Sequence, residues 1–186
     1  PNMTIFVPGD AQEAKQAVRE ALKIKGPVYI RLCAGEVEEI YPPRNKKFKF
    51  GHAKLLHKGG EIALITTGTM TGEALKAADF LSKEEGINVK ILHMSSLKPF
   101  DAEAVTRLAS SAKVLVTLEE HNVIGGLGSA VCATLGNLSR NPKIYNLGIR
   151  DRFSAVGSPS VILEQEGLTA DALAAFLRSL YHGKRN

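Results

Sequence analysis

Two acidic side chains and an imidazole stand together in one short stretch, Glu119-Glu120-His121. Neighbouring carboxylates can raise one another's pKa and histidine titrates near neutral pH, so the trio could do acid–base chemistry or bind a metal. Successive side chains of a strand point to opposite faces, so the three converge only if the chain turns at Glu120. No G-x-S-x-G motif supplies a nucleophile. We favour a structural or interface role over direct chemistry or metal binding, and all three stay open.

A glycine cluster, Gly125, Gly126 and Gly128, follows this trio. A dinucleotide fingerprint has the spacing G-x-G-x-x-G or ends in alanine, but a count from Gly126 reaches Val131 at the last position. The phosphate-binding pattern G-x-x-x-x-G-K-[ST] does not occur anywhere in the chain. We therefore expect these glycines to permit positive φ angles and close packing of a helix on a strand, rather than to bind a nucleotide.

Other charged residues show no spacing that indicates a site. Four further histidines have no partners at ligand spacing and are interpreted as surface or packing residues: His52, His57, His93 and His182. Asp151 and Arg152 are adjacent, and adjacent residues rarely pair, so we expect each of them to have its own partner. The segment Lys98-Pro99-Phe100-Asp101 is interpreted as a loop that ends in a helix cap.

The acidic trio and the glycines are positioned by a strand before them and a helix after them. Residues 114–118 form a short apolar run rich in β-branched types, which predicts a buried strand. Residues 129–135 have helix-forming character. A strand, a polar corner, a glycine turn and a helix in this order place the polar groups at the carboxyl end of a parallel strand, where open α/β sheets bind ligands and partners.

Strands alternate with helices from residue 51 onward, which predicts a three-layer α/β/α fold around a mostly parallel sheet. Further strands are expected at residues 53–56, 62–67, 87–94 and 144–149. Helices are expected between Gly68 and Gly86, after Asp101, and from Thr169 to Leu180.

The opening of the chain, as far as Leu32, predicts a strand–helix–strand unit that is too small to cover a parallel sheet on both faces. Asp10 and Glu13 have the spacing of a capping box at the start of its helix. The helix carries small and apolar residues on one face: Ala14, Ala17, Val18, Ala21 and Leu22. Residues 34–50 are interpreted as a linker, within which Phe48 and Phe50 alternate with lysines as in an edge strand with one buried face.

Composition indicates an ordinary globular chain of 186 residues, with 44% hydrophobic and 23% charged residues. Its net charge of +5 is spread along the chain, so we expect no nucleic-acid or membrane partner. Cys33 and Cys132 show no paired spacing, which is typical of a cytoplasmic protein without a disulfide framework or zinc site. Because the chain begins with Pro1, we expect it to be processed or part of something longer.

Seven segments in order along nearly the whole chain resemble the carboxyl-terminal part of the transketolase family. The segments are residues 1–4 with 8–11, 26–31, 67–68, 97–101, 119–121, 125–130 and 148–153. The likeness is greatest to the carboxyl-terminal subunit of a transketolase that is split into two chains. Deoxyxylulose-phosphate synthase and the beta subunits of 2-oxo acid dehydrogenases are related alternatives, and a non-catalytic α/β ligand-binding or regulatory module remains a further one.

The resemblance implies a division of the chain and a function. Residues 1–43 would be the end of a pyrimidine-binding domain, 44–50 a linker, and 51–186 the carboxyl-terminal domain, with a five-stranded, mostly parallel sheet and one antiparallel edge strand. The complete enzyme would transfer a two-carbon ketol unit between sugar phosphates with thiamine diphosphate and magnesium. This portion would support structure and dimerisation beside an N-terminal subunit or upstream domains. No catalytic, cofactor or metal residue maps onto it, so we expect it to be inactive alone.

The resemblance also implies roles for particular residues. Relatives often have two arginines three positions apart, the second of which contacts the substrate's phosphate. Arg31 matches the first arginine and is the candidate substrate-binding residue, but Ala34 stands at the second position. The candidate interface residues are Glu119, Glu120, His121, Gly125, Gly126 and Gly128.

Overall fold

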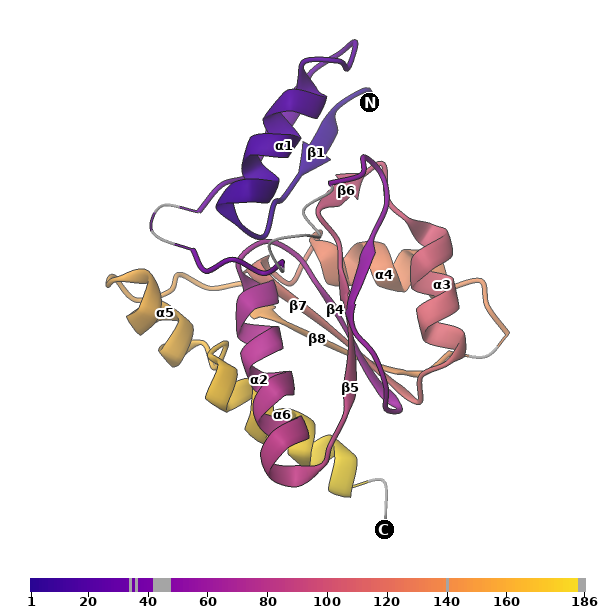
Figure 1. Cartoon of the computed structure of the whole chain (residues 1–186), viewed down its shortest axis with the longest axis vertical. Helices are drawn as coiled ribbons and strands as arrows, with labels where there is room; N and C mark the ends of the chain where they lie inside the picture. The colour runs from indigo at the N-terminus through magenta and orange to yellow at the C-terminus, as the bar shows by residue number, and fades with distance from the viewer. Residues whose placement is uncertain (34, 36, 42–47, 140, 184–186) are drawn as a thin grey trace.

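The computed structural model describes residues 1–33, 35, 37–41, 48–139 and 141–183 (Figure 1). The main sheet has five strands in the order β3-β5-β4-β7-β8. These strands are β3 (Lys54–His57), β5 (Val89–His93), β4 (Ile62–Thr66), β7 (Val114–Asn122) and β8 (Lys143–Ile149). The edge strand β3 runs antiparallel to β5, whereas the other neighbours are parallel. The expected mixed five-stranded sheet with one antiparallel edge strand is therefore confirmed.

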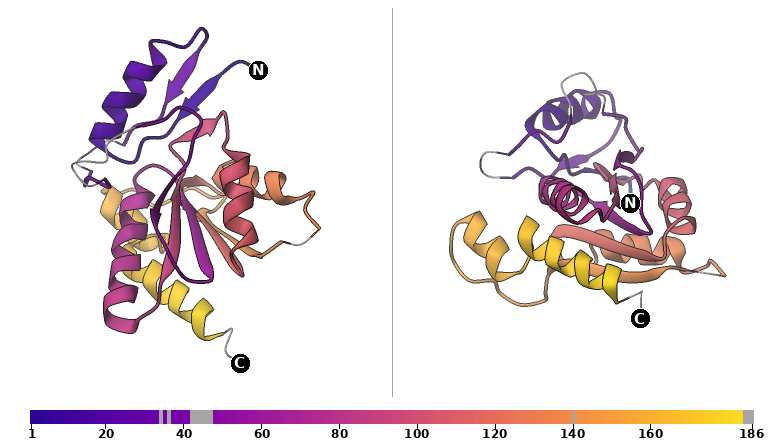
Figure 2. Two further views of the ribbon diagram at one scale, coloured as in Figure 1. Left: turned by 45° about the vertical axis from the view of Figure 1, so that its right-hand side comes forward. Right: turned by 60° about the horizontal axis from the view of Figure 1, so that its bottom comes forward.

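Helices cover both faces of this sheet, which confirms the three-layer prediction (Figures 1 and 2). Helices α2 (Met70–Glu85) and α6 (Ala170–His182) cover one face, and α3 (Ala102–Ser110) and α4 (Leu127–Leu135) cover the other. The short helix α5 (Pro159–Gln165), which the sequence did not predict, packs Leu163 against the core beside α2 and α6. Within the described residues, no helix is both long and apolar enough to cross a lipid bilayer.

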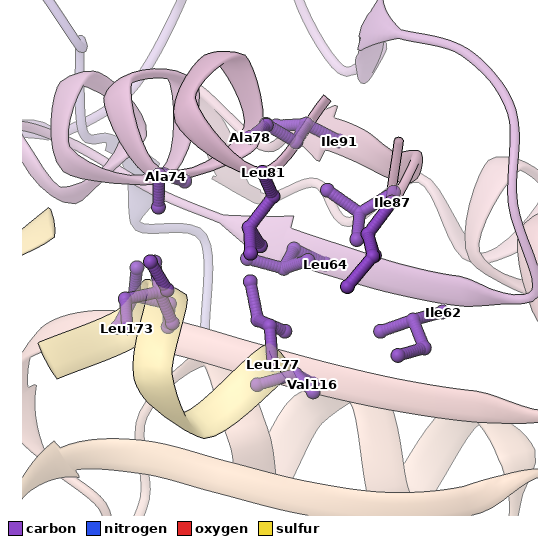
Figure 3. Close-up of a cluster of buried hydrophobic side chains, with 14 of the residues drawn as sticks. Ile62, Leu64, Ala74, Ala78, Leu81, Ile87, Ile91, Val116, Leu173 and Leu177 are labelled. Carbon is purple, nitrogen blue, oxygen red and sulfur yellow. The ribbon is translucent and has the colours of Figure 1, made fainter. Parts of the chain in front are cut away.

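The core under α2 and α6 shows why the central strands are continuous apolar runs. All five residues of β4 are buried, because helices lie on both faces of the sheet. Leu64 and Val116 meet Leu81 of α2 and Leu177 of α6 in this core (Figure 3). Each fully buried leucine contributes about 1.5–3 kcal/mol of transfer free energy.

Residues 1–33, called here the N-terminal unit, form the predicted strand–helix–strand arrangement. It consists of β1 (Thr4–Phe6), α1 (Ala11–Ala21) and β2 (Val28–Ile30), and it lies at one end of the main sheet (Figure 1). Strand β2 is parallel to β1, while β6 (Ser96–Lys98) pairs with β1 on the other side in antiparallel orientation. The N-terminal unit is thus joined to residues 51–183, called here the C-terminal section, by a shared three-stranded sheet.

One local prediction is confirmed except at its first residue, and another is wrong. Residues 99–101 form the expected loop, and Asp101 caps α3 by accepting from the Ala104 amide at 2.9 Å. Lys98, however, is the last residue of β6, which pairs with the edge of β1. The prediction of an edge strand at residues 48–50 is wrong. Phe48 and Phe50 form no strand. Their rings instead pack edge-on against Phe6, with centroids 5.1 and 5.6 Å away, so the alternation with lysine reflects an aromatic cluster. Residues 44–47 of the predicted linker lie outside the described residues.

The apolar face predicted for α1 is buried only in part. Ala17 is buried, but the other inward residue is the charged Glu13. Val18 and Leu22, which were expected to belong to the buried face, are exposed. The helix is therefore turned so that a carboxylate, rather than its largest apolar side chains, faces the C-terminal section.

Candidate functional site at the glycine corner and the border of the N-terminal unit

Glu119 is an internal cap for helix α4. Its side chain is buried, with 1% exposed, and its two oxygens accept hydrogen bonds from the backbone amides of Leu127 at 2.7 Å and Gly128 at 2.9 Å. The helix's own N-cap residue, Gly126, offers no side chain for this purpose. A carboxylate in this place satisfies amides that have no partner within the helix and is stabilised by the positive end of the helix dipole. Glu119 thus fills the position that a bound phosphate would take.

The glycines of the corner make room for this cap. A Cβ atom on Gly126 would lie 2.0 Å from the Oε2 atom of Glu119. A Cβ on Gly128 would lie 2.7 Å from Cγ of Asn146, and Gly125 has a φ of 78°. The expectation that the glycines serve close packing and positive φ is therefore confirmed.

Glu119, Glu120 and His121 each have separate hydrogen-bond partners, so the acidic trio does not form one cluster. Oε2 of Glu120 accepts a hydrogen bond from the hydroxyl of Thr69 at 2.8 Å. His121 is exposed, and its Nδ1 lies 2.9 Å from the carbonyl oxygen of Asn122. Across the part of the chain that the structure describes, no three His, Cys, Asp or Glu side chains are grouped as metal ligands.

Arg31 lies just after β2 and reaches the glycine corner from the N-terminal unit. Its Nη2 donates to the backbone carbonyl of Glu120 at 2.6 Å, and the contact is partly buried. The structure therefore brings Arg31 and Glu120 together, which their 89-residue separation concealed. At the far side of the corner, Asp151 and Arg152 each have a partner of their own, Asn122 for the aspartate and Glu166 for the arginine, as expected.

A second polar cluster, which sequence reasoning missed, lies where α1 meets the C-terminal section. Glu13 of α1 and His93 of β5 are both buried, and Oε2 of Glu13 is 2.7 Å from Nε2 of His93. The other ring nitrogen of His93 lies 2.7 Å from the hydroxyl of Thr71, which in turn lies 3.0 Å from that of Thr66. The interpretation of His93 as a surface or packing residue is therefore wrong: it is a bonded member of a buried network.

Glu13 holds three hydrogen bonds at once. Besides His93, it accepts from the backbone amide of Gly9 at 2.7 Å and from the hydroxyl of Tyr41 at 2.7 Å. Burial alone would raise the pKa of the Glu13 carboxyl, but the attraction of His93 and these hydrogen bonds lower it below its ordinary value. Burial and the neighbouring carboxylates of Glu13 and Asp10 raise the pKa of Tyr41, so its hydroxyl stays a donor.

The order carboxylate, imidazole, hydroxyl in this network is that of a hydrolase triad, but its surroundings exclude that chemistry. The hydroxyl of Thr71 is fully buried, with 0% of the residue exposed, so no substrate carbonyl could reach it. The network therefore holds structure. One feature could have signalled it: a titratable residue, His93, at the end of a mostly apolar strand.

The fold described above is that of the C-terminal domain of a family of group-transfer enzymes. The family model "Transketolase, C-terminal domain" matches residues 51–173. The chain belongs to the transketolase family and contains its C-terminal domain.

Relatives and a solved structure agree with this assignment. The chain is 41% identical over 91% of its length to the 6-deoxy-6-sulfo-D-fructose transketolase subunit SqwH of Clostridium sp. (strain MSTE9), and the match covers 52% of that protein. It is 37% identical, over its full length, to 29% of the 1-deoxy-D-xylulose-5-phosphate synthase of Chlorobium phaeovibrioides (strain DSM 265 / 1930). The solved structure "Split gene transketolase, inactive beta4 tetramer" matches with 38% identity and a TM-score of 0.83, covering 96% of this chain and 57% of that one. The chain thus spans about half the length of the split-type relatives that it matches.

Proposed function

We propose that this chain forms the C-terminal part of a transketolase-type transferase that moves a two-carbon ketol unit between sugar phosphates. The observation that carries the proposal is the match to split-type relatives over more than nine-tenths of the chain but only about half of theirs. The corner at Glu119, where helix α4 is capped from within, supports a scaffold role for this portion. The remaining half of such an enzyme would hold the reacting groups.

Thiamine diphosphate and magnesium, on which the family depends, would be held outside this chain. When bound, the cofactor supplies a stabilised carbanion, and protein groups orient it and exclude water. The helix terminus of this chain that most resembles a diphosphate site, at α4, is already filled by the Glu119 carboxylate. The residues of the corner therefore do not fit a diphosphate.

Residues 1–43 would be the end of a pyrimidine-binding domain. Strand β2 has β1 as its single neighbour among the described strands, so its other edge is open to further pairing. Val18 and Leu22 on α1 and Tyr29 and Leu32 at β2 are exposed apolar residues of the same N-terminal unit. An open strand edge beside exposed apolar side chains supports the proposal that upstream domains or an N-terminal subunit cover this unit.

The carboxyl edge of the main sheet would provide contacts within a homodimer. Of the six candidate interface residues, Glu119, Gly126 and Gly128 build the corner from inside, while His121 and Gly125 lie on its surface and Glu120 is partly buried. Ile124 on this edge, with Phe153 and Val156 after β8, adds exposed apolar surface beside them. The two free, exposed cysteines support a cytoplasmic location.

Reconstitution tests the proposal directly. The chain would be combined with its N-terminal partner or upstream domains, thiamine diphosphate and magnesium, and two-carbon transfer from a ketose phosphate to an aldose phosphate would be measured. We expect transfer by the complete enzyme and none by the chain alone. A complete enzyme that binds the cofactor but turns over 2-oxo acids instead would show a 2-oxo acid dehydrogenase, and one that binds no cofactor would show a non-catalytic module.

The role of Arg31 is testable in the same assay. We propose that it contributes to substrate binding through its place beside the corner, although this chain has Ala34 where relatives have the second arginine. Arg31→Lys keeps the charge but loses the planar fork that reaches the Glu120 carbonyl. A rise in KM for the phosphorylated substrate with little change in kcat is expected, and an unchanged KM would remove Arg31 from the binding site.

A further inference from the structure

The border between the N-terminal unit and the C-terminal section is fixed by one strand pairing and two long-range polar contacts. Strand β6 pairs with β1, and the Val7 amide donates to the Ser95 carbonyl at 2.9 Å. Arg31 makes a partly buried contact with Glu120, whereas the contact of Glu13 with His93 is fully buried. The buried contact is shielded from water, so its loss would leave an unpaired charge or ring nitrogen inside the protein.

The buried contact is satisfied in either protonation state of the imidazole. With His93 neutral, its Nε2 proton faces Glu13 and its Nδ1 accepts from the hydroxyl of Thr71. With His93 protonated, Nδ1 donates instead, and the hydroxyl of Thr71 turns to Thr66. Both ring nitrogens are thus paired in either arrangement, which suits a permanent connection between the two parts of the chain.

The His93 ring lies directly beneath the turn between β1 and α1. A Cβ atom on Gly9 of this turn would lie 3.0 Å from Cε1 of His93 and 2.4 Å from Cδ1 of Ile40. The turn therefore packs against the His93 ring, and the backbone amide of Gly9 in the turn donates a hydrogen bond to Glu13. Because the turn follows the carboxyl end of β1, its position controls the edge at which parallel sheets bind ligands.

The same turn forms one wall of a pocket of about 500 Å³ that both parts of the chain line. Gly9, Asp10, Leu32 and Cys33 come from the N-terminal unit, and Thr69 comes from the C-terminal section. A rotation of one part on the other would change the shape of this pocket and move the end of β2, where Arg31 lies. Glu13 of the buried contact accepts a hydrogen bond from the amide of Gly9 in this pocket wall.

We propose that Glu13 and His93 are positioning residues: their buried contact sets the orientation of the N-terminal unit on the C-terminal section and so places Arg31 and the pocket wall. The orientation itself follows from the contacts, whereas its consequence for substrate binding rests on the proposed function. Neither residue would contact the substrate. Both act through the β1–α1 turn and the end of β2.

Spin-label distances test the orientation without substrate or cofactor. One label is placed on the exposed Cys132 of α4 and the other on α1 through Lys15→Cys, with Cys33→Ser and any cysteines of the completing region replaced. In the complete protein, pulsed electron resonance should give one narrow distance distribution. Glu13→Ala and His93→Ala should each broaden or shift it.

Two matched variants separate orientation from general loss of stability. Glu13→Gln has almost the same shape: its carbonyl oxygen can accept from Gly9 and His93 while its amide donates to Tyr41, so the narrow distribution should return. Leu177→Ala removes core volume on α6, far from the border, and should lower the melting temperature without changing the distance. A wild-type distribution in both Glu13→Ala and His93→Ala would overturn the proposal.

Kinetics of the complete enzyme test the consequence for binding. In Glu13→Ala the KM for the phosphorylated substrate should rise about tenfold, with a smaller change in kcat. This effect is smaller than the roughly hundredfold loss of rate that a 1 Å misplacement can cause. Glu13→Gln should restore the KM. If the complete wild-type enzyme does not transfer a two-carbon unit, the proposed function is refuted. The spin-label distances between α1 and α4 would still test the orientation proposed here. An active enzyme whose Glu13→Ala variant keeps the wild-type KM would overturn the inference alone.

Discussion

Replacing Gly126 by alanine should destabilise the protein by displacing the buried carboxylate of Glu119 near the end of β7. The new Cβ would lie 2.0 Å from Oε2 and 2.7 Å from Cδ of Glu119, so the carboxylate must move. It would then lose one or both of its bonds to the amides of Leu127 and Gly128. Hydrogen bonds to charged groups contribute about 1.5–3 kcal/mol each, so the expected loss is about 2–5 kcal/mol.

Urea unfolding at neutral pH measures this loss, and Gly72→Ala is the matched control. Gly72 lies inside α2 with open space where a methyl group would be added and no positive φ, so alanine there should stabilise the protein by about 0.5–1 kcal/mol. Opposite signs at the two glycines would show that the effect comes from the surroundings rather than from the loss of glycine itself.

A double-mutant cycle identifies the carboxylate as the cause. In a Glu119→Ala background the new methyl group at Gly126 has no oxygens to displace, so its cost should fall below about 1 kcal/mol. A cost in that background equal to the cost in the wild type would refute the reasoning, as would a Gly126→Ala protein that unfolds at the wild-type urea concentration.

The remaining predictions concern the buried network and the core. Folding lowers the pKa of Glu13 below its ordinary value of 4.5. The ionised carboxylate therefore contributes its full stabilisation above pH 4.5 and loses it as pH falls through the folded pKa. Urea midpoints measured between pH 6 and pH 3 should fall more steeply for the wild type than for Glu13→Gln. Thr71→Val should cost about 1–3 kcal/mol in urea unfolding, because it removes the hydroxyl partner of His93; a cost near zero would contradict the network. Leu177→Ala should cost about 2–5 kcal/mol by calorimetry, and a much smaller loss would mean that the site collapses around the cavity.

The main sheet could be predicted from the sequence because its signals are local. The buried strands are apolar runs, and Gly86 ends α2 in the left-handed conformation that only glycine adopts easily. Strand β6 and helix α5 could not be predicted in this way. The first is a strand only because β1 offers its edge, and the second is short and contains no fully buried residue, so neither has a periodic apolar pattern.

The candidate site was predictable only where its partners are close in sequence. Glu119 lies eight and nine residues from the amides that it caps, and the glycines between them indicate a tight corner. Glu13 and His93 are 80 residues apart, and neither position has a neighbour in the sequence that would reveal the other. The capping-box spacing of Asp10 and Glu13 already accounts for a glutamate at this position of α1, so the sequence gives no reason to expect its contact with His93.

These two carboxylates show how one chain uses buried charge in two different ways. Glu119 is held by backbone amides of its own section, so it fixes a local corner whatever the rest of the enzyme does. Glu13 is held by a side chain of the other part, so its energy depends on how the two parts are arranged. Because a buried polar group is costly without its partner, a displaced N-terminal unit would leave Nε2 of His93 unpaired and would remove one of the three hydrogen bonds of Glu13. The orientation of the unit is therefore coupled to this buried contact in addition to the pairing of β1 with β6 and the contact of Arg31 with Glu120.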